Sequence, residues 1–440
     1  MCDLLVIPFL ERSMQSDDFR GLVLKNTLTN RKELFSPRNP GEVRIFTCGP
    51  SVYRRPHVGN YRSFLYEDIL VRYLEYLGYR VKRTINFTDV EDKTISTAAE
   101  EGKEVIQVTT PVVEAFFNEC TLLGIKLPDH IPRSSTSIDD AVEIIQVLID
   151  KGHAYRHDGN IYFDPLTYDG FGEIFGLDMS RWPKRKVRYS QDTYPGQRWN
   201  LGDFILWHGH QDDRLIYWDT PIGRGRPSWN VQDPAMTKQT LGYEIDIHCG
   251  GIDNMWRHHD YNRAIMESAS GVEFAHYWLH GEHLIVDGDK MSKSKGNEIY
   301  PEHLQARGRT GRHIRFLLIY GYYRDKLNVT DRLIDERFTR IKDIQQLVGD
   351  VVGAGSDGGV KPAKGSVAAQ MERVAREIVP LFEHAMNDDL HVEAAVDAVC
   401  GALGELRSLA AKAGLPAALR KSVEKSLRRV DTVLGILFEE

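Results

Sequence analysis

Cysteine is scarce in this sequence and is not arranged in pairs. Five cysteines occur among 440 residues, they lie far apart, and none forms a CxxC pair. An odd and scattered set argues against a disulfide scaffold and favours a reducing compartment, which we expect to be the cytoplasm. Long apolar runs are missing too, because no stretch approaches the roughly 18 residues that span a membrane. The short apolar run at the start has no basic segment ahead of it, so we expect no signal peptide.

Positive charge is not in excess either. The chain has 56 Lys and Arg against 63 Asp and Glu, a net charge of −7, so a nucleic-acid partner would need a local basic patch. The last predicted helices carry a modest basic cluster that fits a solvated helix face better than an RNA contact: Lys412, Arg420, Lys421, Lys425, Arg428 and Arg429. Apolar residues (42%) and charged residues (27%) have ordinary globular frequencies, which predicts a folded protein of about two to four domains.

A βαβ unit is predicted near the beginning of the chain. Val43–Cys48 alternates and is rich in β-forming residues, so it predicts a strand. Apolar residues then recur at helical spacing over about 61–78, and Gly78 is the expected C-cap. Tyr79–Phe87 predicts the next strand. Two strands joined by a helix lie parallel, so the pattern indicates an α/β domain with a parallel sheet.

The rest of the chain falls into three regions. Residues 110–153 predict helices, and short strands at Ile161–Phe163 and Phe204–Trp207 lie among polar loops, so about 110–225 is expected to be an insertion. Further strands are predicted at Ile245–His248 and Leu284–Val286. The pattern is helical from about 311, a flexible linker is expected at Gly353–Gly365, and three helices follow near 367–387, 391–413 and 416–437.

Two short segments have the composition of phosphate-binding sites. His57-Val58-Gly59-Asn60 lies between the first strand and helix, where backbone N–H groups and the helix dipole hold anions. Gly59 permits close approach of a ligand, and His57 adds a donor. Asp289–Asn297 (DKMSKSKGN) places lysines beside hydroxyls, which suits a polyphosphate. Taken separately, the first segment fits an ordinary helix start better than an anion site, and a solvated basic loop is the usual meaning of a lysine cluster such as the second.

Together these segments resemble a known enzyme family. HVGN resembles the HIGH motif of class I aminoacyl-tRNA synthetases, with Asn60 in place of the last histidine, and Lys290–Ser294 is the KMSKS motif letter for letter. Within that class the chain resembles the cysteinyl-tRNA synthetases from about Leu24 to its end. The segments that carry the resemblance are FTCGPSVYRRPHVGN (46–60), NFTDVEDKTI (86–95), GRPSW (225–229), DIHCGGID (246–253) and HHDYN (258–262).

The resemblance implies a domain organisation. A Rossmann-type parallel-sheet catalytic domain, with its insertion, would occupy 24–310 after an N-terminal extension at 1–23. Stem-contact-like helices would follow at 311–350, and an all-α helical bundle at 365–440. We expect no anticodon-binding domain, a truncation that is shared by the mycothiol-pathway cysteine ligases of the same family.

The resemblance also implies a chemistry and its residues. The carboxylate of an amino acid would attack the α-phosphate of Mg²⁺-bound ATP and expel pyrophosphate, a step that depends on positioning and charge neutralisation. His57, Asn60, Lys290 and Lys293 would be catalytic, with Lys293 stabilising the transition state. The ATP site would consist of His57, Gly59, Asn60, Gly250, Gly251, Asp253, Lys290, Ser292 and Lys293.

The sequence departs from the family at the zinc site, which selects the cysteine thiolate. Two cysteines, a histidine and a glutamate hold this zinc in the family, and the matching positions are Cys48, Asp233, His258 and Asn262. Asp233 can still bind zinc, Asn262 is a poor ligand, and Cys249 is a conceivable replacement. Retention and loss of zinc therefore both stay open. The amino-acid pocket would be lined by Cys48, Thr88, Trp229, Asp233 and His258.

Three hypotheses for the function follow. The first is an enzyme that activates an amino acid with ATP and transfers it to a small amine, a hydroxyl or a carrier, independently of an anticodon. The second is a cysteine–tRNA ligase that charges tRNA. The third is a non-catalytic paralogue that binds a nucleotide or RNA. The presence of His57 and Lys293 argues against the third, and no membrane partner is expected.

Overall fold

The structure is a computed structural model that describes residues 21–189, 201–210, 216–292, 295–353 and 363–438. Most of the predicted N-terminal extension and most of the predicted linker at Gly353–Gly365 lie outside the described residues. The same is true of Lys293. The predictions made for these segments therefore stay predictions.

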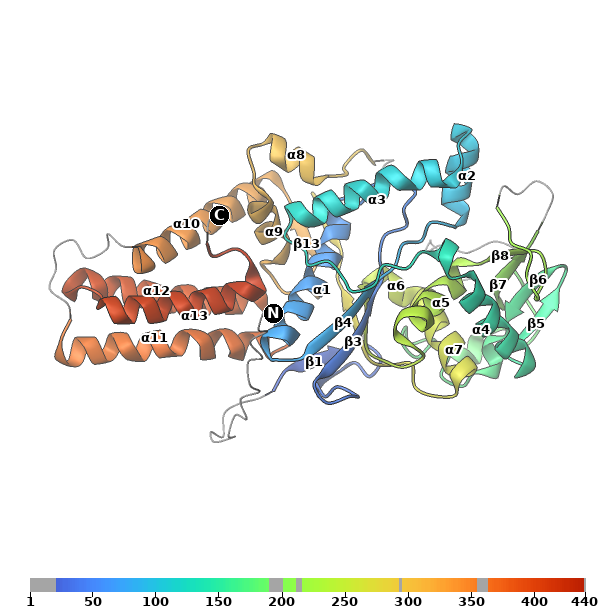
Figure 1. Cartoon of the computed structure of the whole chain (residues 1–440), viewed down its shortest axis with the longest axis horizontal. Coiled ribbons are helices and arrows are strands. Elements are labelled where there is room, and N and C mark those ends of the chain that lie inside the picture. Colours follow the sequence, from blue (N-terminus) through green and yellow to red (C-terminus); the bar gives the residue numbers. More distant parts are fainter. Residues whose placement is uncertain (1–20, 190–200, 211–215, 293–294, 354–362, 439–440) are drawn as a thin grey trace, which may run out of the picture.

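A four-stranded parallel sheet forms the centre of the molecule (Figure 1). Its strands are β10 (Ala275–Gly281), β9 (Ile245–Gly251), β3 (Glu42–Thr47) and β4 (Arg80–Ile85), in that order. Each neighbouring pair is parallel. Val43, Ile45 and Phe46 of β3 are fully buried, as expected for a central strand covered on both faces. The predicted α/β fold with a parallel sheet is confirmed.

Helix α1 (Val58–Tyr76) connects β3 to β4 and completes the predicted βαβ unit. It begins three residues earlier than the apolar pattern indicates. His57 stays extended as the N-cap (φ −92°, ψ 172°), and the side-chain oxygen of Asn60 accepts a hydrogen bond from the His57 N–H at 3.0 Å. The segment HVGN therefore contains the first turn of the helix. At the other end Leu77 is the C-cap, and Gly78 follows in a left-handed conformation (φ +97°).

The described residues between 92 and 227, a segment that begins before the predicted insertion at about 110–225, form two long helices, a shorter one and a second sheet. The helices are α2 (Asp92–Glu101), α3 (Val105–Leu122) and α4 (Ile138–Asp150), with short 3₁₀ turns at Ser134–Thr136, Pro165–Thr167 and Met179–Arg181. The antiparallel sheet has the order β5 (Ala154–His157), β6 (Asn160–Phe163), β7 (Phe204–Gly209) and β8 (Gly225–Pro227). The two strands predicted from sequence, Ile161–Phe163 and Phe204–Trp207, are adjacent in this sheet.

The chain then returns to the parallel sheet. The returning helices are α5 (Trp229–Leu241), α6 (Ile252–Asn254) and α7 (Asp260–Ser270), with a π-helical turn at Met255–His259 between the last two. Small β-structures flank the sheet: the hairpin β1 (Val23–Asn26) and β2 (Arg31–Leu34), and the three strands β12 (Asp289–Lys290), β11 (Leu284–Val286) and β13 (Leu327–Val329). Helices α8 (Pro301–Ala306), α9 (Gly311–Ile319) and α10 (Asp331–Val352) lead away from it.

Three antiparallel helices end the described chain: α11 (Gly365–Met386), α12 (Val392–Ala413) and α13 (Ala417–Leu434). Their bounds lie within three residues of those predicted from sequence. In Figure 1 this bundle forms one end of the molecule and the antiparallel sheet of the insertion forms the other. Within the described ranges, no helix is long and apolar enough to cross a membrane.

A buried ion pair joins the bundle to α1. The Arg315 guanidinium of α9 donates to Asp68 Oδ2 at 2.7 Å, and the two side chains are 2% and 0% exposed. Arg315 also donates to the carbonyl oxygen of Leu434 at the end of α13, at 2.7 Å. Burial alone would raise the pKa of Asp68, but Arg315, Arg72 and the Lys126 N–H lower it below its usual value. Asp68 and Arg315 thus link α1, α9 and the end of α13.

Replacing Arg315 with alanine should leave the Asp68 carboxylate underpaired in the interior. We expect the unfolding free energy to fall by about 3–5 kcal/mol, the typical cost of breaking a buried pair. Urea denaturation followed by circular dichroism measures the change. The matched control is Arg332→Ala, which removes a side chain that is 86% exposed, and we expect it to change stability by less than about 0.5 kcal/mol. Equal effects of the two substitutions would contradict the assignment.

Candidate functional site

The N-terminus of α1 lies at the carboxyl end of β3, where a parallel sheet places its ligands. Burial, followed by the charge of Arg54, lowers the pKa of His57, so the imidazole is neutral at pH 7 and can donate a hydrogen bond. The Nδ1 atom of His57 is buried and has no hydrogen-bond partner among the described residues. With the positive end of the helix dipole beside it, this segment has the properties of an anion site.

The two phosphate-type segments of the sequence are in direct contact. A Cβ atom added at Gly59 would lie 2.5 Å from Met291 Cε and 3.0 Å from the His57 ring. Met291, the second residue of the KMSKS segment, is 6% exposed and packs in the same core as α1. Gly59 is therefore required by the close approach of Met291. This contact places Lys290 and Ser292, the neighbours of Met291, near the start of α1.

The described part of the KMSKS segment is a turn tied by Asn297. The Ser292 N–H donates to Asn297 Oδ1 at 2.9 Å, and the Asn297 amide donates to the Lys290 carbonyl oxygen at 3.3 Å. Lys290 is exposed at the end of β12. Because Lys293 lies outside the described residues, its catalytic role stays a prediction.

Gly250 and Gly251 end β9 opposite α1 and leave no room for side chains. A Cβ at Gly250 would lie 2.8 Å from the His259 ring, and one at Gly251 would lie 2.7 Å from Asp253 Oδ1. One cavity connects the two halves of the predicted site, since its walls include Asn60, Gly251 and Asp253 from the ATP set and Cys48 and Trp229 from the amino-acid set. A nucleotide and a small acyl substrate could thus meet in one space.

Three of the four predicted zinc positions are in one group. Cys48 Sγ lies 3.5 Å from Asp233 Oδ2, and His258 Nε2 lies 2.8 Å from the same oxygen. The other oxygen of Asp233 accepts from the Asn86 amide at 2.9 Å. Asp233 and His258 are each 2% exposed. Both carboxylate oxygens of Asp233 therefore already have partners within the protein. Asp233 is not available to pair with a cationic group of a substrate.

The remaining predicted residues lie around this group. Trp229 stacks on the His258 ring, with centroids 3.9 Å apart and planes 13° apart. Thr88 accepts from the Asn86 amide at 3.3 Å. Asn262 is not brought into the group, because its amide nitrogen is positioned to donate to the main-chain oxygens of Asn230 (3.3 Å) and His258 (3.2 Å). Its side chain supports the helix.

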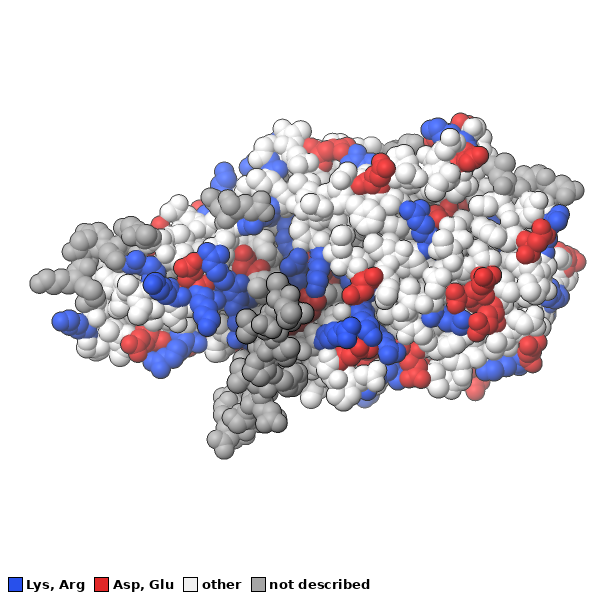
Figure 2. Space-filling model, in the orientation of Figure 1, with Lys and Arg blue, Asp and Glu red and all other residues white. Residues whose placement is uncertain are grey.

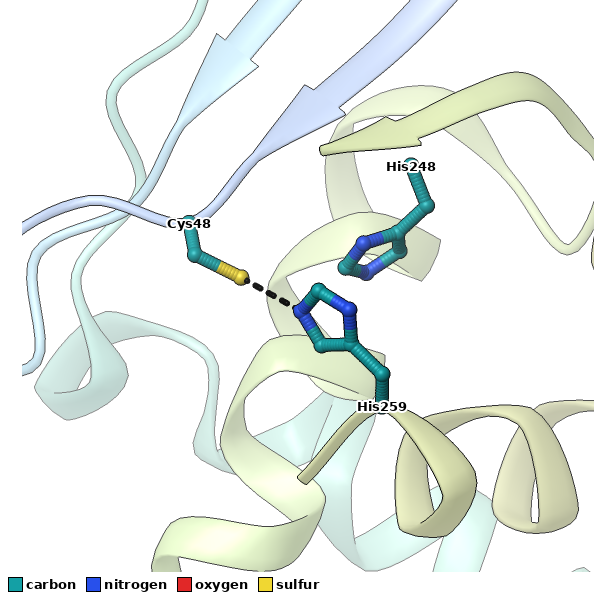
Figure 3. A group of neighbouring side chains, drawn as sticks. All are labelled: Cys48, His248 and His259. Atoms are coloured by element: carbon teal, nitrogen blue, oxygen red, sulfur yellow. Dashed lines mark hydrogen bonds between the residues drawn. The ribbon is translucent and has the colours of Figure 1, made fainter. Parts of the chain in front are cut away.

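Two histidines that the sequence interpretation assigned no role also face Cys48. His259 Nε2 lies 3.2 Å from Cys48 Sγ, and His248 of β9 is in edge-on contact with the His259 ring, 4.4 Å between centroids. Figure 3 shows the three side chains converging from β3, β9 and the π-helical turn. That turn contains Arg257 with φ +74°, a conformation that is costly for a residue with a side chain. The only sequence signals were the doublet His258-His259 and a histidine inside an apolar strand.

The donor types fit a zinc ion. The ligand atoms of Cys48, Asp233 and His258 all lie within 4.8 Å of one another, and so do those of Cys48, His248 and His259. Thiolate, imidazole and carboxylate are the ligands that zinc takes in proteins. Burial lowers the pKa values of His248 and His259 well below the usual value, so both rings are neutral, the form that binds metal. Burial, followed by Asp233, raises the pKa of Cys48, so its thiol is protonated until a cation is nearby.

Comparisons of sequence and of structure with known proteins all match this chain to aminoacyl-tRNA synthetases. The family model of the tRNA synthetases class I (C) catalytic domain matches residues 34–339. A cysteine–tRNA ligase of Chlamydia pneumoniae is 34% identical over 96% of this chain and 88% of its own length. One of Brachyspira hyodysenteriae is 40% identical over 75% of this chain and 69% of its own length. A solved methionyl-tRNA synthetase of Mycobacterium tuberculosis, bound by methionyl-adenylate, has a TM-score of 0.66 at 14% identity and covers 90% of this chain and 92% of its own, which shows the fold.

The contact of Gly59 with Met291 gives a test of the ATP site. Replacing Gly59 with alanine would force the Met291 side chain and the His57 ring apart, so we expect ATP affinity to fall about tenfold, as overpacking by one methyl group typically costs 1 kcal/mol or more. Isothermal titration calorimetry with ATP measures it. Gly349→Ala in α10 is the matched control, because a Cβ there meets nothing within 4 Å. Wild-type affinity in the Gly59 variant would show that this contact does not shape the ATP site.

Proposed function

Because the chain belongs to the class I (C) tRNA synthetase family, as a cysteinyl-tRNA synthetase-like ligase that activates an amino acid with ATP, we propose that it joins cysteine to tRNA. The observation that carries the proposal is the single cavity lined by both sets of residues, Asn60, Gly251 and Asp253 on one side and Cys48 and Trp229 on the other. Family membership makes the chain an enzyme, so the hypothesis of a non-catalytic paralogue is set aside.

The acceptor in this proposal differs from our first hypothesis. Sequence length favoured a small amine, a hydroxyl or a carrier as the acceptor. The relatives that match nearly the whole chain carry the name cysteine–tRNA ligase, which supports tRNA, and none of the comparisons supports another acceptor. In Figure 2, Lys and Arg side chains gather over the bundle end of the molecule, with acidic side chains among them. Several basic residues of the bundle are already paired, among them Arg373 with Glu377, Arg428 with Glu424 and Arg429 with Glu383.

The first step in the proposed reaction is adenylate formation. ATP, as its Mg²⁺ complex, would place its phosphates at the start of α1, where the neutral His57 donates and the helix dipole favours negative charge. Lys290 and Lys293 would neutralise the charge that develops on the leaving pyrophosphate. The glycine pair 250–251 would let the nucleoside lie against the end of β9, where Asp253 offers an acceptor for ribose hydroxyls.

The second requirement is a pocket that distinguishes a thiol from a hydroxyl. Either of the two overlapping ligand groups around Cys48 could hold zinc, and zinc when bound would supply a coordination site for the substrate thiolate. Contacts within the protein fix the side chains of the predicted amino-acid pocket. Trp229 stacks on His258, and the Asn86 amide donates to both Thr88 and Asp233. Such fixed polar groups favour one substrate by leaving the pocket unpaired when another enters.

Amino-acid-dependent ATP–pyrophosphate exchange tests the first step. We expect exchange with cysteine and much weaker exchange with serine. With total tRNA added, labelled cysteine should become acid-precipitable. Exchange with a different amino acid alone would contradict the substrate, and exchange with cysteine that never leads to a charged tRNA would contradict the acceptor.

Cys48 gives a matched variant pair for the same assay. We expect Cys48→Ala to lower kcat/KM for cysteine by at least about 100-fold, with the KM for ATP changed less than about threefold, because the sulfur faces the amino-acid part of the cavity. Cys400→Ala removes a cysteine of α12 that is 8% exposed and distant from the cavity, and should keep wild-type kinetics. If both variants behave alike, Cys48 has no role in binding the amino acid.

A further inference from the structure

The strongest unexplained feature of the interior is the group Cys48, His248 and His259 (Figure 3). Cys48 follows β3, His248 lies near the end of β9 and His259 ends the π-helical turn. Their ligand atoms all lie within 4.8 Å of one another. Two of the three, His248 and His259, are outside the set of positions that the family resemblance designates for zinc.

The distances suit a tetrahedral ion. Zinc–sulfur and zinc–nitrogen bonds of about 2.3 and 2.1 Å at a tetrahedral angle separate the sulfur and nitrogen by about 3.6 Å. Cys48 Sγ and His259 Nε2 are 3.2 Å apart, so an ion between them requires a movement of only a few tenths of an ångström. No hydrogen bond joins His248 to His259 among the described contacts, and the ion would replace the hydrogen bond between Cys48 and His259.

His248 is the observation that calls for a ligand. Its side chain is fully buried, and neither ring nitrogen has a hydrogen-bond partner among the described residues. Around it are Trp278, stacked at 4.6 Å, and Phe46 at 5.1 Å. A buried polar group without a partner is costly and rare in native proteins. Coordination of one nitrogen to an ion would remove most of that cost.

His259 is oriented by a chain of hydrogen bonds. Its Nδ1 lies 2.8 Å from His280 Nε2, and His280 Nδ1 lies 2.9 Å from the Thr27 hydroxyl. If His259 donates to His280, and His280 donates to Thr27, the lone pair of His259 Nε2 is directed at Cys48. Outer-shell bonds of this kind fix the tautomer of histidines that bind metal.

In the neighbouring group, Asp233 and the Nε2 atom of His258 have partners without an ion, whereas His258 Nδ1 is buried and has none among the described residues. Asp233 and His258 bond to each other at 2.8 Å, and Asn86 occupies the second oxygen of Asp233 at 2.9 Å. We propose that a zinc ion binds Cys48, His248 and His259, one residue further along the helix than the histidine the family resemblance designates. Zinc with a single thiolate keeps a charge of +1, so its fourth position favours an anionic ligand.

The test uses the purified full-length chain and metal alone, with no substrate. We expect one zinc per chain, and X-ray absorption should show one sulfur and two imidazole neighbours. The cobalt-substituted protein should show a sulfur-to-cobalt charge-transfer band that Cys48→Ser abolishes. His248→Gln and His259→Gln should each weaken zinc binding by at least about 100-fold, and His280→Gln by about 10–100-fold, the usual effect of an outer-shell change.

Two histidine variants serve as comparisons. His258→Gln should change zinc affinity less than about threefold, since in the assigned site it is a neighbour and not a ligand. His276→Gln, at an exposed position of β10, controls for histidine loss in general. Circular dichroism and thermal melting show whether each variant still folds. If a variant is unfolded, its loss of zinc is discounted, and the X-ray absorption spectrum of the wild type decides the ligands.

Three results would overturn the assignment. They are a metal-free wild-type chain in the presence of excess zinc, a single imidazole in the X-ray absorption spectrum, and loss of zinc on changing Asp233 or His258 but not His248 or His259. The last two would place the ion in the group of Cys48, Asp233 and His258. None of these measurements uses catalysis, so the metal site and the proposed reaction fail or stand separately.

Discussion

The parallel pairing of β3 with β9 positions the groups at the centre of the site. Its ladder pairs Thr47 with Cys249, and the Cys48 N–H continues it by donating to the Cys249 carbonyl oxygen at 3.2 Å. This pairing brings the end of β3, the start of α1 and the glycine turn after β9 to one edge of the sheet. Since successive side chains of a strand point to opposite faces, His248 and Cys249 cannot both face Cys48. The ladder selects His248.

Helix α1 transmits this arrangement to the bundle. Its first turn contains Gly59 and Asn60 in the site, and Asp68 near its middle holds Arg315 and through it the end of α13. Its last turns reach α11, where Tyr73 donates to Asn387 at 2.7 Å and Tyr76 donates to Glu383 at 2.8 Å. One helix thus spans the distance from the cavity to the bundle, so movement of the bundle as a body would shift the turn that contains Gly59 and Asn60.

Local patterns in the sequence predicted the βαβ unit, β9 and the helices of the bundle, but they did not predict β10 of the central sheet or the helices α5 and α7. Apolar spacing located α1 and the bundle helices to within three residues, because these helices bury one continuous face. It missed the start of α1, since the capping bond between His57 and Asn60 is not apolar. It could not show that His248 and His259 face Cys48, because that depends on strand register and on a strained turn at Arg257. The family resemblance likewise placed Asn262 among the ligands, but its amide faces main-chain oxygens.

The aspartate at position 233 has a consequence for the redox chemistry of the pocket. A metal site with two cysteines can lose its ion and close into a disulfide when it is oxidised, which locks the site shut until a reductant opens it. Here the sulfur of Cys48 faces a carboxylate at 3.5 Å, and these two side chains cannot become covalently joined. Peroxide at this position can only add oxygen to one sulfur, a change that begins with a reversible sulfenic acid. With Asp233 at this position, oxidation of the pocket cannot form a disulfide between these two side chains.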